Sequence, residues 1–231
     1  ADPSRDLADR ERAGTGHRAP DGAALRLLAT PMLSFGRRDR PEPPMSDAAV
    51  VKRPATHQDV LDAPEHMVAQ IVDGALHLHP RPASRHALAA AALHAKIGAP
   101  FGFGDGGPGS WWIVFEPELH LGEDVLVPDL AGWRRERMPA FPDVAAFELA
   151  PDWICEVLSP STRALDLTSK RRLYADHGVQ HLWLVDPDAR TLEAFALDAG
   201  RWVLAASVAG EGPVSLAPFE PLSFDLRALW P

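Results

Sequence analysis

The sequence predicts a single α/β domain in which helices flank a mixed central β-sheet. Two apolar runs, Trp153–Leu158 and His181–Val185, have the character of strands that are buried on both faces. A helical pattern from Leu165 to His177 lies between them and stops at Gly178, so the three segments form a β–α–β unit with parallel strands. The 231 residues are enough for one domain with a large core.

Helix and strand signals also precede this unit. Thr56 and Asp59 are spaced as a helix N-cap and a first-turn acid, which predicts a short helix that reaches Ala63. The pair Asp73-Gly74 predicts a tight β-hairpin. Further expected elements are hairpin strands at 67–72 and 76–78, a helix over 84–97 closed by Gly98, and a glycine-rich loop over 101–110.

The remaining elements complete the sheet. Strands are expected at 111–115 and 125–133, followed by a polar, proline-containing excursion over 134–150. After the β–α–β unit, turns at 187–190 and 198–200 bound two more strands, at 191–197 and 202–207. The segment 216–230 is interrupted by proline, and we expect it to pack across the edge of the sheet.

Residues 1–44 differ in composition from the rest of the chain. They are rich in Arg, Asp, Gly and Pro and end in the linker-like run Arg40-Pro41-Glu42-Pro43-Pro44. We therefore expect residues 1–44 to be a disordered extension or a non-native N-terminal segment, and residues 45–231 to form the α/β domain. A genuine but flexible N-terminal arm is the alternative.

The composition restricts the class of protein. With 23 Lys+Arg against 32 Asp+Glu, the net charge of −9 argues against tight, non-specific nucleic-acid binding through a broadly basic surface, although a local basic groove remains possible. The sequence contains no apolar run of 18 residues, so no membrane span is expected. The single Cys155 excludes an internal disulfide framework, and the absence of a visible secretory signal favours a cytoplasmic location.

Two carboxylates stand alone in apolar runs. Asp129 is the only charge in the stretch Val125–Trp133, and Glu156 is the only carboxylate in Trp153–Leu158. A buried carboxylate must be protonated, paired or bound to a cation, and oxygen ligands favour Mg²⁺ or Mn²⁺ over zinc. Pro128 cannot donate to a strand ladder, so an edge or a bulge is expected beside Asp129. We expect the two carboxylates to lie close enough to share one cation.

The helix that follows Glu156 carries a second pattern. Asp166, Lys170, Tyr174 and Gly178 recur every four residues and therefore share one face. Lys170 is one of only three lysines in the chain, and Tyr174 is the only tyrosine. On this evidence alone, Asp166 and Lys170 can equally form a surface ion pair, and Tyr174 can be a core residue.

Other candidate sites are weaker. His77 and His79 face the same side of a strand but have no third metal ligand nearby in sequence, so an exposed hairpin is the preferred interpretation. Ser159 and Ser161 have no histidine near them, which argues against a serine hydrolase. The glycine-rich loop contains no lysine and so is not a Walker-type phosphate loop.

Together, several segments carry a family resemblance. They are Val127-Pro128-Asp129-Leu130, the run from Asp152 to Thr162, the series Asp166, Lys170, Tyr174 and Gly178, and Leu182-Trp183-Leu184-Val185-Asp186-Pro187. These segments resemble the Uma-two family of restriction-endonuclease-like proteins in the PD-(D/E)xK nuclease superfamily. Ile71-Val72-Asp73-Gly74 and His86 also fit, so the resemblance covers residues 50–210.

The resemblance implies a restriction-endonuclease-like domain and a Mg²⁺- or Mn²⁺-dependent endonuclease acting on DNA. It implies Asp129 and Glu156 as metal ligands and catalytic residues. The superfamily places its lysine two residues after the acid, where this chain has Leu158, and Lys170 matches the relocated lysine of the family. Gln70 stands at a position where the family often has Glu. The resemblance implies Gln70 as an auxiliary residue, whose neutral carbonyl can coordinate a metal but adds no charge.

The residues around these candidate ligands each have two interpretations. Tyr174 is either an auxiliary residue that contacts Lys170 or a phosphate, or a core residue. Arg163, Arg171 and Arg172, with a second cluster at 134–137, supply phosphate contacts or simply form a solvated face. A homodimer is expected because cutting two strands needs two centres. The alternatives are a non-catalytic nucleic-acid-binding or protein-interaction module of the same fold, and an enzyme acting on RNA or a small phosphodiester.

Overall fold

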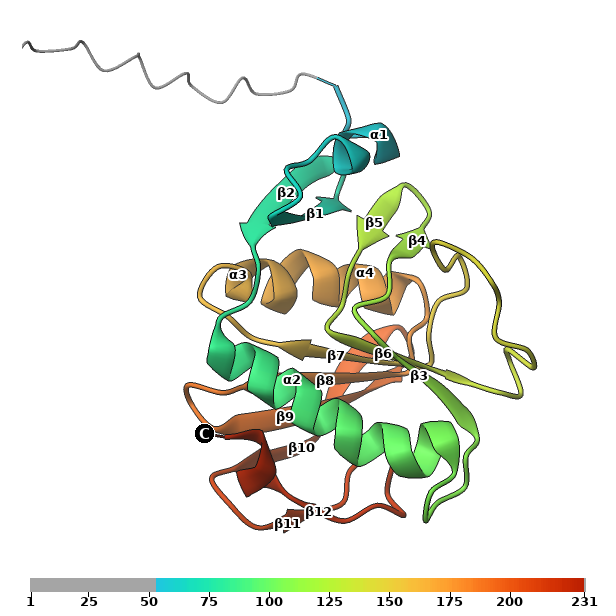
Figure 1. Ribbon diagram of the computed structural model, residues 1–231, viewed down its shortest axis with the longest axis vertical. Coiled ribbons are helices and arrows are strands. Elements are labelled where there is room, and N and C mark those ends of the chain that lie inside the picture. Colours follow the sequence, from blue (N-terminus) through green and yellow to red (C-terminus); the bar gives the residue numbers. More distant parts are fainter. Residues whose placement is uncertain (1–52, 231) are drawn as a thin grey trace, which may run out of the picture. The chain divides into compact units, whose positions relative to one another are not determined.

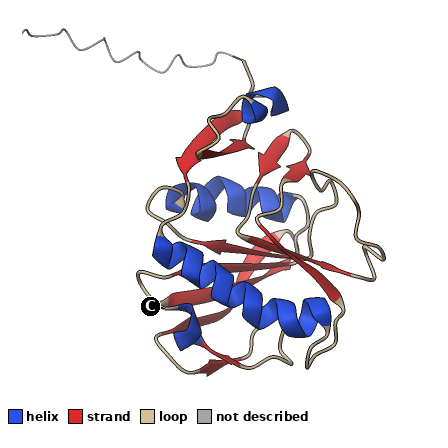
Figure 2. Ribbon diagram, viewed as in Figure 1, coloured by secondary structure: helices blue, strands red, loops and turns tan. Residues whose placement is uncertain are grey.

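The computed structural model describes residues 53–230, which fold as a mixed α/β domain (Figures 1 and 2). This result confirms the predicted fold class. The expected N-terminal extension, residues 1–44, lies outside the described residues. Within residues 53–230, every helix is too short or too polar to cross a membrane.

A six-stranded sheet forms the centre of the domain, with its strands in the order β10-β9-β8-β7-β6-β3. Strands β7 and β8 are parallel, as the β–α–β unit predicts, whereas the other neighbouring pairs are antiparallel. The strands are β3 Trp111–Phe115, β6 Leu130–Arg134, β7 Trp153–Val157, β8 His181–Asp186, β9 Thr191–Asp198 and β10 Arg201–Ala209.

A second, four-stranded antiparallel sheet has the order β2-β1-β5-β4. Asp73 and Gly74 join its first two strands and adopt positive φ values of 55° and 72°, as the predicted tight hairpin requires. The strands are β1 Met67–Val72, β2 Ala75–Pro80, β4 Leu119–Leu121 and β5 Asp124–Leu126, preceded by helix α1 His57–Leu61. Thr56 and Asp59 form a capping box at the start of α1, where the sequence predicts it.

Helix α2, Ser84–Ile97, covers one face of the six-stranded sheet (Figure 1). Its residues Leu93 and Ile97 belong to the same core as Trp153 on the sheet. Phe219 from the C-terminal segment is buried in this core and packs against Trp153 and Trp183 of β7 and β8, so the segment lies on the face of the sheet and not across its edge as expected. The short C-terminal elements are β11 Pro213–Val214, β12 Phe224–Asp225 and a 3₁₀ helix, Leu226–Leu229.

The opposite face of the sheet carries the helix of the β–α–β unit. It consists of α3 Arg163–Leu165, a π-helical turn Asp166–Lys170 and α4 Arg171–Asp176. Leu173 and Tyr174 pack with Ile154 and Leu182 of the sheet. The chain leaves this helix at Gly178, with a φ of 74°, as predicted. Single π-helical turns are rare and occur often at functional sites.

Helix α2 does not end at Gly98 as the sequence suggests. Gly98 keeps helical angles, with a φ of −64° and a ψ of −40°, and a π-helical turn, Gly98–Phe103, follows it. The chain leaves the helix only at Gly104, with a φ of 82°, so part of the expected loop is helical. Phe101 lies buried against Phe219, and this packing stabilises the additional turn.

The strand predicted over residues 125–133 is divided between the two sheets. Its first part is β5 of the four-stranded sheet, and its second part is β6 of the six-stranded sheet. Pro128 lies at the crossing, where its missing N–H removes a ladder hydrogen bond. Asp129 consequently lies where the chain enters the central sheet, immediately before Leu130.

Candidate active site

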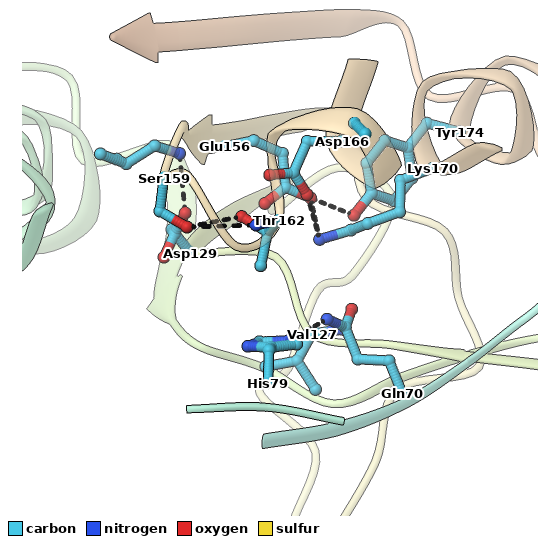
Figure 3. Close-up of polar contacts among 12 residues, drawn as sticks. Gln70, His79, Val127, Asp129, Glu156, Ser159, Thr162, Asp166, Lys170 and Tyr174 are labelled. Carbon is cyan, nitrogen blue, oxygen red and sulfur yellow. Dashed lines mark hydrogen bonds and ion pairs between the residues drawn. The ribbon is translucent and has the colours of Figure 1, made fainter. Parts of the chain in front are cut away.

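Asp129 and Glu156 occupy facing positions on neighbouring segments of the central sheet. Strands β6 and β7 are antiparallel with Leu130 opposite Cys155, so the next position in register places Asp129 opposite Glu156. Directly opposed side chains have Cβ atoms about 4.5–5.5 Å apart. Both carboxylates face one cavity on the helix α3–α4 side of the sheet (Figure 3).

The Asp129 carboxylate is held from two sides. The backbone N–H of Val157 donates to Oδ2 over 2.7 Å, and Nε2 of His86 lies 3.2 Å from Oδ1. His86 is buried on α2. Burial lowers the pKa of His86, but the hydrogen bond to Asp129 and the charges of Asp129 and Glu156 outweigh this effect and raise the pKa above its ordinary value. Asp129 therefore has little freedom to rotate.

A buried ion cluster surrounds Glu156. The Lys170 ammonium lies 2.6 Å from Glu156 Oε1 and 3.1 Å from Asp166 Oδ1, and the Tyr174 hydroxyl donates to Glu156 Oε1 over 2.5 Å. Lys170, Glu156 and Asp166 are each only 2% exposed. The ion pair between Asp166 and Lys170, for which a surface position was one alternative, is therefore buried. Tyr174 is a core residue, as its other interpretation had it, and its hydroxyl contacts a carboxylate.

Each pKa in this cluster is shifted by its surroundings. Burial is the largest influence on Glu156 and raises its pKa, the Lys170 ammonium opposes the rise, and Asp166 and Asp129 add to it. Burial alone would lower the pKa of Lys170, but the two carboxylates beside it outweigh burial and raise that pKa. Burial also raises the pKa of Tyr174, followed in effect by the charge of Glu156, so its hydroxyl stays protonated as a donor.

Gln70 and His79 form the opposite wall of the site (Figure 3). The Gln70 carbonyl oxygen accepts the backbone N–H of Val127 over 2.9 Å, and this contact fixes the orientation of the amide. The amide nitrogen lies 2.7 Å from His79 Nε2, which must therefore be the acceptor. Burial, and then the charge of Lys170, lower the pKa of His79, which keeps the ring neutral.

This geometry changes the expected role of Gln70. Its carbonyl, the only group able to bind a metal, is directed at Val127, and its amide N–H groups are directed toward His79. Gln70 therefore directs its donors at this wall, while its carbonyl oxygen keeps one lone pair that the Val127 N–H does not use.

The cavity between these walls has a volume of about 220 Å³. Its remaining lining comes from the segment between β2 and α2, the residue after β3 and the turn after β7. The lining residues include Arg81, Pro82, Glu116, Ser159, Ser161 and Thr162. Ser159 accepts the backbone N–H of Thr162 and is also hydrogen-bonded to its hydroxyl, so the turn has a fixed shape.

The charge balance of the cavity fits a divalent cation. Four carboxylates line it, those of Glu116, Asp129, Glu156 and Asp166, together with the cations Lys170 and Arg81 and with His86. Burial and the neighbouring carboxylates raise the pKa of Glu156 to about 8, although the Lys170 ammonium opposes the rise. A divalent cation would relieve the repulsion between these carboxylates and hold them ionised. Carboxylate oxygens are the ligands that Mg²⁺ and Mn²⁺ prefer.

The structure does not bring the predicted phosphate-binding arginines to the cavity. Arg163 pairs with Asp186, and the Arg171 guanidinium lies 4.2 Å from the centre of the Phe195 ring. Arg172 pairs with Asp73 and Asp176. The arginines of the 134–137 cluster are also engaged, in contacts with Trp111, Trp112 and Asp152. Of the arginines in the described residues, Arg81 is the one that lines the cavity.

Three residues of the site have roles that the sequence patterns did not indicate. His79 was expected on an exposed hairpin but lines the cavity, because Gln70 on the paired strand draws its ring inward. His86 had no assigned role, although a lone histidine on an alanine-rich helix face is a usable signal. For Asp166 a surface ion pair with Lys170 was left open, because sequence spacing does not reveal which face of a helix is buried.

The fold and a family match place the chain in the restriction-endonuclease-like class. A crystal structure of "a putative nuclease belonging to DUF820" from Anabaena variabilis superimposes with a TM-score of 0.62 and 22% identity, covering 76% of this chain and 97% of that one. The family model Uma2, described as "Putative restriction endonuclease", matches residues 55–228. No curated protein matches the sequence. The chain belongs to the Uma2 family, as the sequence resemblance indicated.

The orientation of Gln70 generates a first prediction. In a Gln70→Glu variant, one oxygen accepts from Val127 and the other faces His79, so a negative charge replaces a neutral donor. We expect the pKa of His79 to rise, because a neighbouring carboxylate stabilises the imidazolium form. An NMR titration of the ring measures this change. The exposed Gln180→Glu serves as the control, and an unchanged pKa of His79 in Gln70→Glu would show that the amide is oriented otherwise.

The buried cluster generates a second prediction. Lys170→Met retains the bulk of the side chain but removes its charge, leaving Glu156 and Asp166 buried without their cation. We expect the free energy of unfolding, measured by urea denaturation without metal, to fall by about 3–5 kcal/mol. Lys96→Met, at an exposed position on α2, is the matched control and should change the free energy of unfolding by less than about 0.5 kcal/mol. Equal effects of the two variants would contradict the buried ion cluster.

Proposed function

We propose that this protein is a Mg²⁺- or Mn²⁺-dependent endonuclease that hydrolyses phosphodiester bonds in DNA. The observation that carries the proposal is the convergence of Asp129, Glu156 and Lys170 on one cavity, from the residue before β6, from β7 and from the π-helical turn before α4. Membership of the Uma2 family supports nuclease chemistry. Asp129 and Glu156 are the proposed metal ligands. Asp166 forms an ion pair with Lys170 and helps to raise the pKa of its ammonium group.

A divalent cation bound at Asp129 and Glu156 would polarise a phosphoryl oxygen and lower the pKa of a bound water. The chain's own residues prepare this site. The Val157 N–H and His86 fix the orientation of Asp129, and the Tyr174 hydroxyl fixes that of Glu156. These contacts keep the carboxylates in place before a substrate arrives.

Lys170 is the proposed electrostatic catalyst. Its raised pKa keeps the side chain an ammonium, and an ammonium beside the scissile phosphate stabilises the negative charge that develops there. The carboxylates of Glu156 and Asp166 hold Lys170 in position through two ion pairs. Asp166 and Tyr174 are positioning residues in this scheme, because each acts through Lys170 or Glu156.

The substrate would approach past the turn after β7 and the start of α2. Arg81, with the backbone and hydroxyl groups of Ser159–Thr162, is the proposed source of phosphate contacts in place of Arg163, Arg171 and Arg172. Because the net charge of the chain is −9, we propose that attraction of DNA is local to this cavity. A cytoplasmic homodimer, with one centre for each DNA strand, completes the proposal.

The test is cleavage of supercoiled plasmid DNA by the purified protein with Mg²⁺ or Mn²⁺. We expect cleavage that chelator abolishes and that Asp129→Ala reduces by at least about 10²-fold, the scale of losing one element of transition-state stabilisation. Asp143→Ala, an exposed aspartate outside the cavity, is the matched control and should retain wild-type activity.

Two outcomes would overturn the proposal. Equal cleavage by the wild type and Asp129→Ala would trace the activity to a contaminating nuclease. Absence of cleavage of DNA with either metal, by protein that is folded, would favour the non-catalytic module of the same fold. The neutral amide of Gln70 would then be the first candidate for the loss of activity.

A further inference from the structure

A second cluster of metal-ligating side chains lies apart from the cavity, where helix α1 meets strand β4. Glu118 and His120 are two residues apart along an extended segment, so their side chains project on the same face while the buried Leu119 projects on the other. His57, the first residue of α1, faces them from across the fold. None of the three lines the cavity that contains Asp129.

The three ligand atoms are already close together. Oε1 of Glu118 lies 3.1 Å from Nε2 of His57 and 2.7 Å from Nε2 of His120. One ligand atom from each residue lies within 4.8 Å of the other two, and the imidazole ring centroids are 4.7 Å apart. Ligands at about 2.0–2.1 Å from a tetrahedral zinc ion are about 3.3 Å apart, so small side-chain movements would complete the site.

The backbone holds these ligands in place. The N–H of His120 donates to the Phe147 carbonyl, and the N–H of Phe147 donates to the Glu118 carbonyl, each over 2.9 Å. On the other side, the capping box of Thr56 and Asp59 fixes the first turn of α1, where His57 lies. Both halves of the cluster are therefore ordered by contacts that do not involve the histidine rings.

We propose that His57, Glu118 and His120 form a binding site for a zinc-class divalent ion that joins α1 to β4. Two imidazole nitrogens with one carboxylate oxygen suit zinc, whereas Mg²⁺ prefers oxygen ligands alone. The side chains are 44%, 30% and 28% exposed in this order, which leaves room for a water molecule as the fourth ligand. A bound ion would take the place of the Nε2–H protons that the two imidazole rings direct at Glu118.

The consequence of this site is structural. His57 and Glu118 are 61 positions apart in the sequence, so an ion held by both closes a long loop. A ligand that binds only the folded state stabilises it in proportion to its affinity and concentration. The ion would thus link the first helix of the described domain to the four-stranded sheet, independently of any ion at Asp129.

The experiment is a calorimetric titration of the full-length, untagged protein with Zn²⁺, carried out in the Asp129→Ala background to remove one of the two proposed ligands of the other site. We expect one ion per chain, and a loss of affinity in His57→Ala and His120→Ala greater than the roughly 10–100-fold cost of losing an outer-shell partner. His66→Ala, which removes an exposed histidine outside the cluster, is the matched control. Mg²⁺ should not compete.

Glu118→Gln serves where an alanine variant fails to fold, because it retains an acceptor for both rings but removes the carboxylate ligand. We expect weaker Zn²⁺ binding and no Zn²⁺-induced rise in melting temperature for this variant. Wild-type affinity in His57→Ala, His120→Ala or Glu118→Gln would overturn the proposal. So would an equal loss in His66→Ala, or the absence of Zn²⁺ binding by the Asp129→Ala protein. Each of these three results would leave the nuclease proposal unaffected, since that proposal depends on Mg²⁺ or Mn²⁺ and DNA.

Discussion

The buried Lys170 ammonium is the interaction on which the site depends. It is 2% exposed and pairs with two carboxylates that would otherwise repel each other in the protein interior. Burying charges in this way is expensive and seldom adds net stability compared with an apolar core. The cluster is therefore better explained by its role in the cavity, where it holds the Lys170 ammonium in a fixed position beside the carboxylates.

The rest of the fold supplies the geometry that this cluster needs. The break at Pro128 sends the chain from one sheet to the other and brings Asp129 opposite Glu156. The parallel β7–β8 crossover places the helix that carries Asp166, Lys170 and Tyr174 over the same end of the sheet. The β1–β2 hairpin closes the far wall with Gln70 and His79.

Much of this arrangement could be predicted from local sequence patterns. Asp73-Gly74 identified the hairpin, and the apolar runs around Glu156 and Leu184 identified the parallel strands. A lone carboxylate in each of two apolar runs identified Asp129 and Glu156 as the residues to examine, because burial of an unpaired charge is costly. The four-residue spacing of Asp166, Lys170 and Tyr174 correctly indicated one helix face.

The remaining features depend on contacts between distant segments, which local patterns do not encode. Spacing alone could not show whether Lys170 faces solvent or Glu156, because that depends on how the helix packs against β7. The direction of the Gln70 amide is set by Val127, 57 positions away in the sequence. Arg163, Arg171 and Arg172 were expected to contact phosphate. In the folded chain they contact Asp186, Phe195 and Asp73, in this order. Only the fold brings the side chains of His57, Glu118 and His120 close together.

The most direct test of the central claim is a crystal structure of the protein with Mn²⁺, with the ion located by its anomalous scattering. The account predicts a Mn²⁺ ion in the cavity, within about 2.0–2.6 Å of a carboxylate oxygen of both Asp129 and Glu156. Lys170 should remain beside Glu156 in that structure. Saturating Mn²⁺ with no ion at these two carboxylates, or an ion found only elsewhere on the chain, would contradict the account.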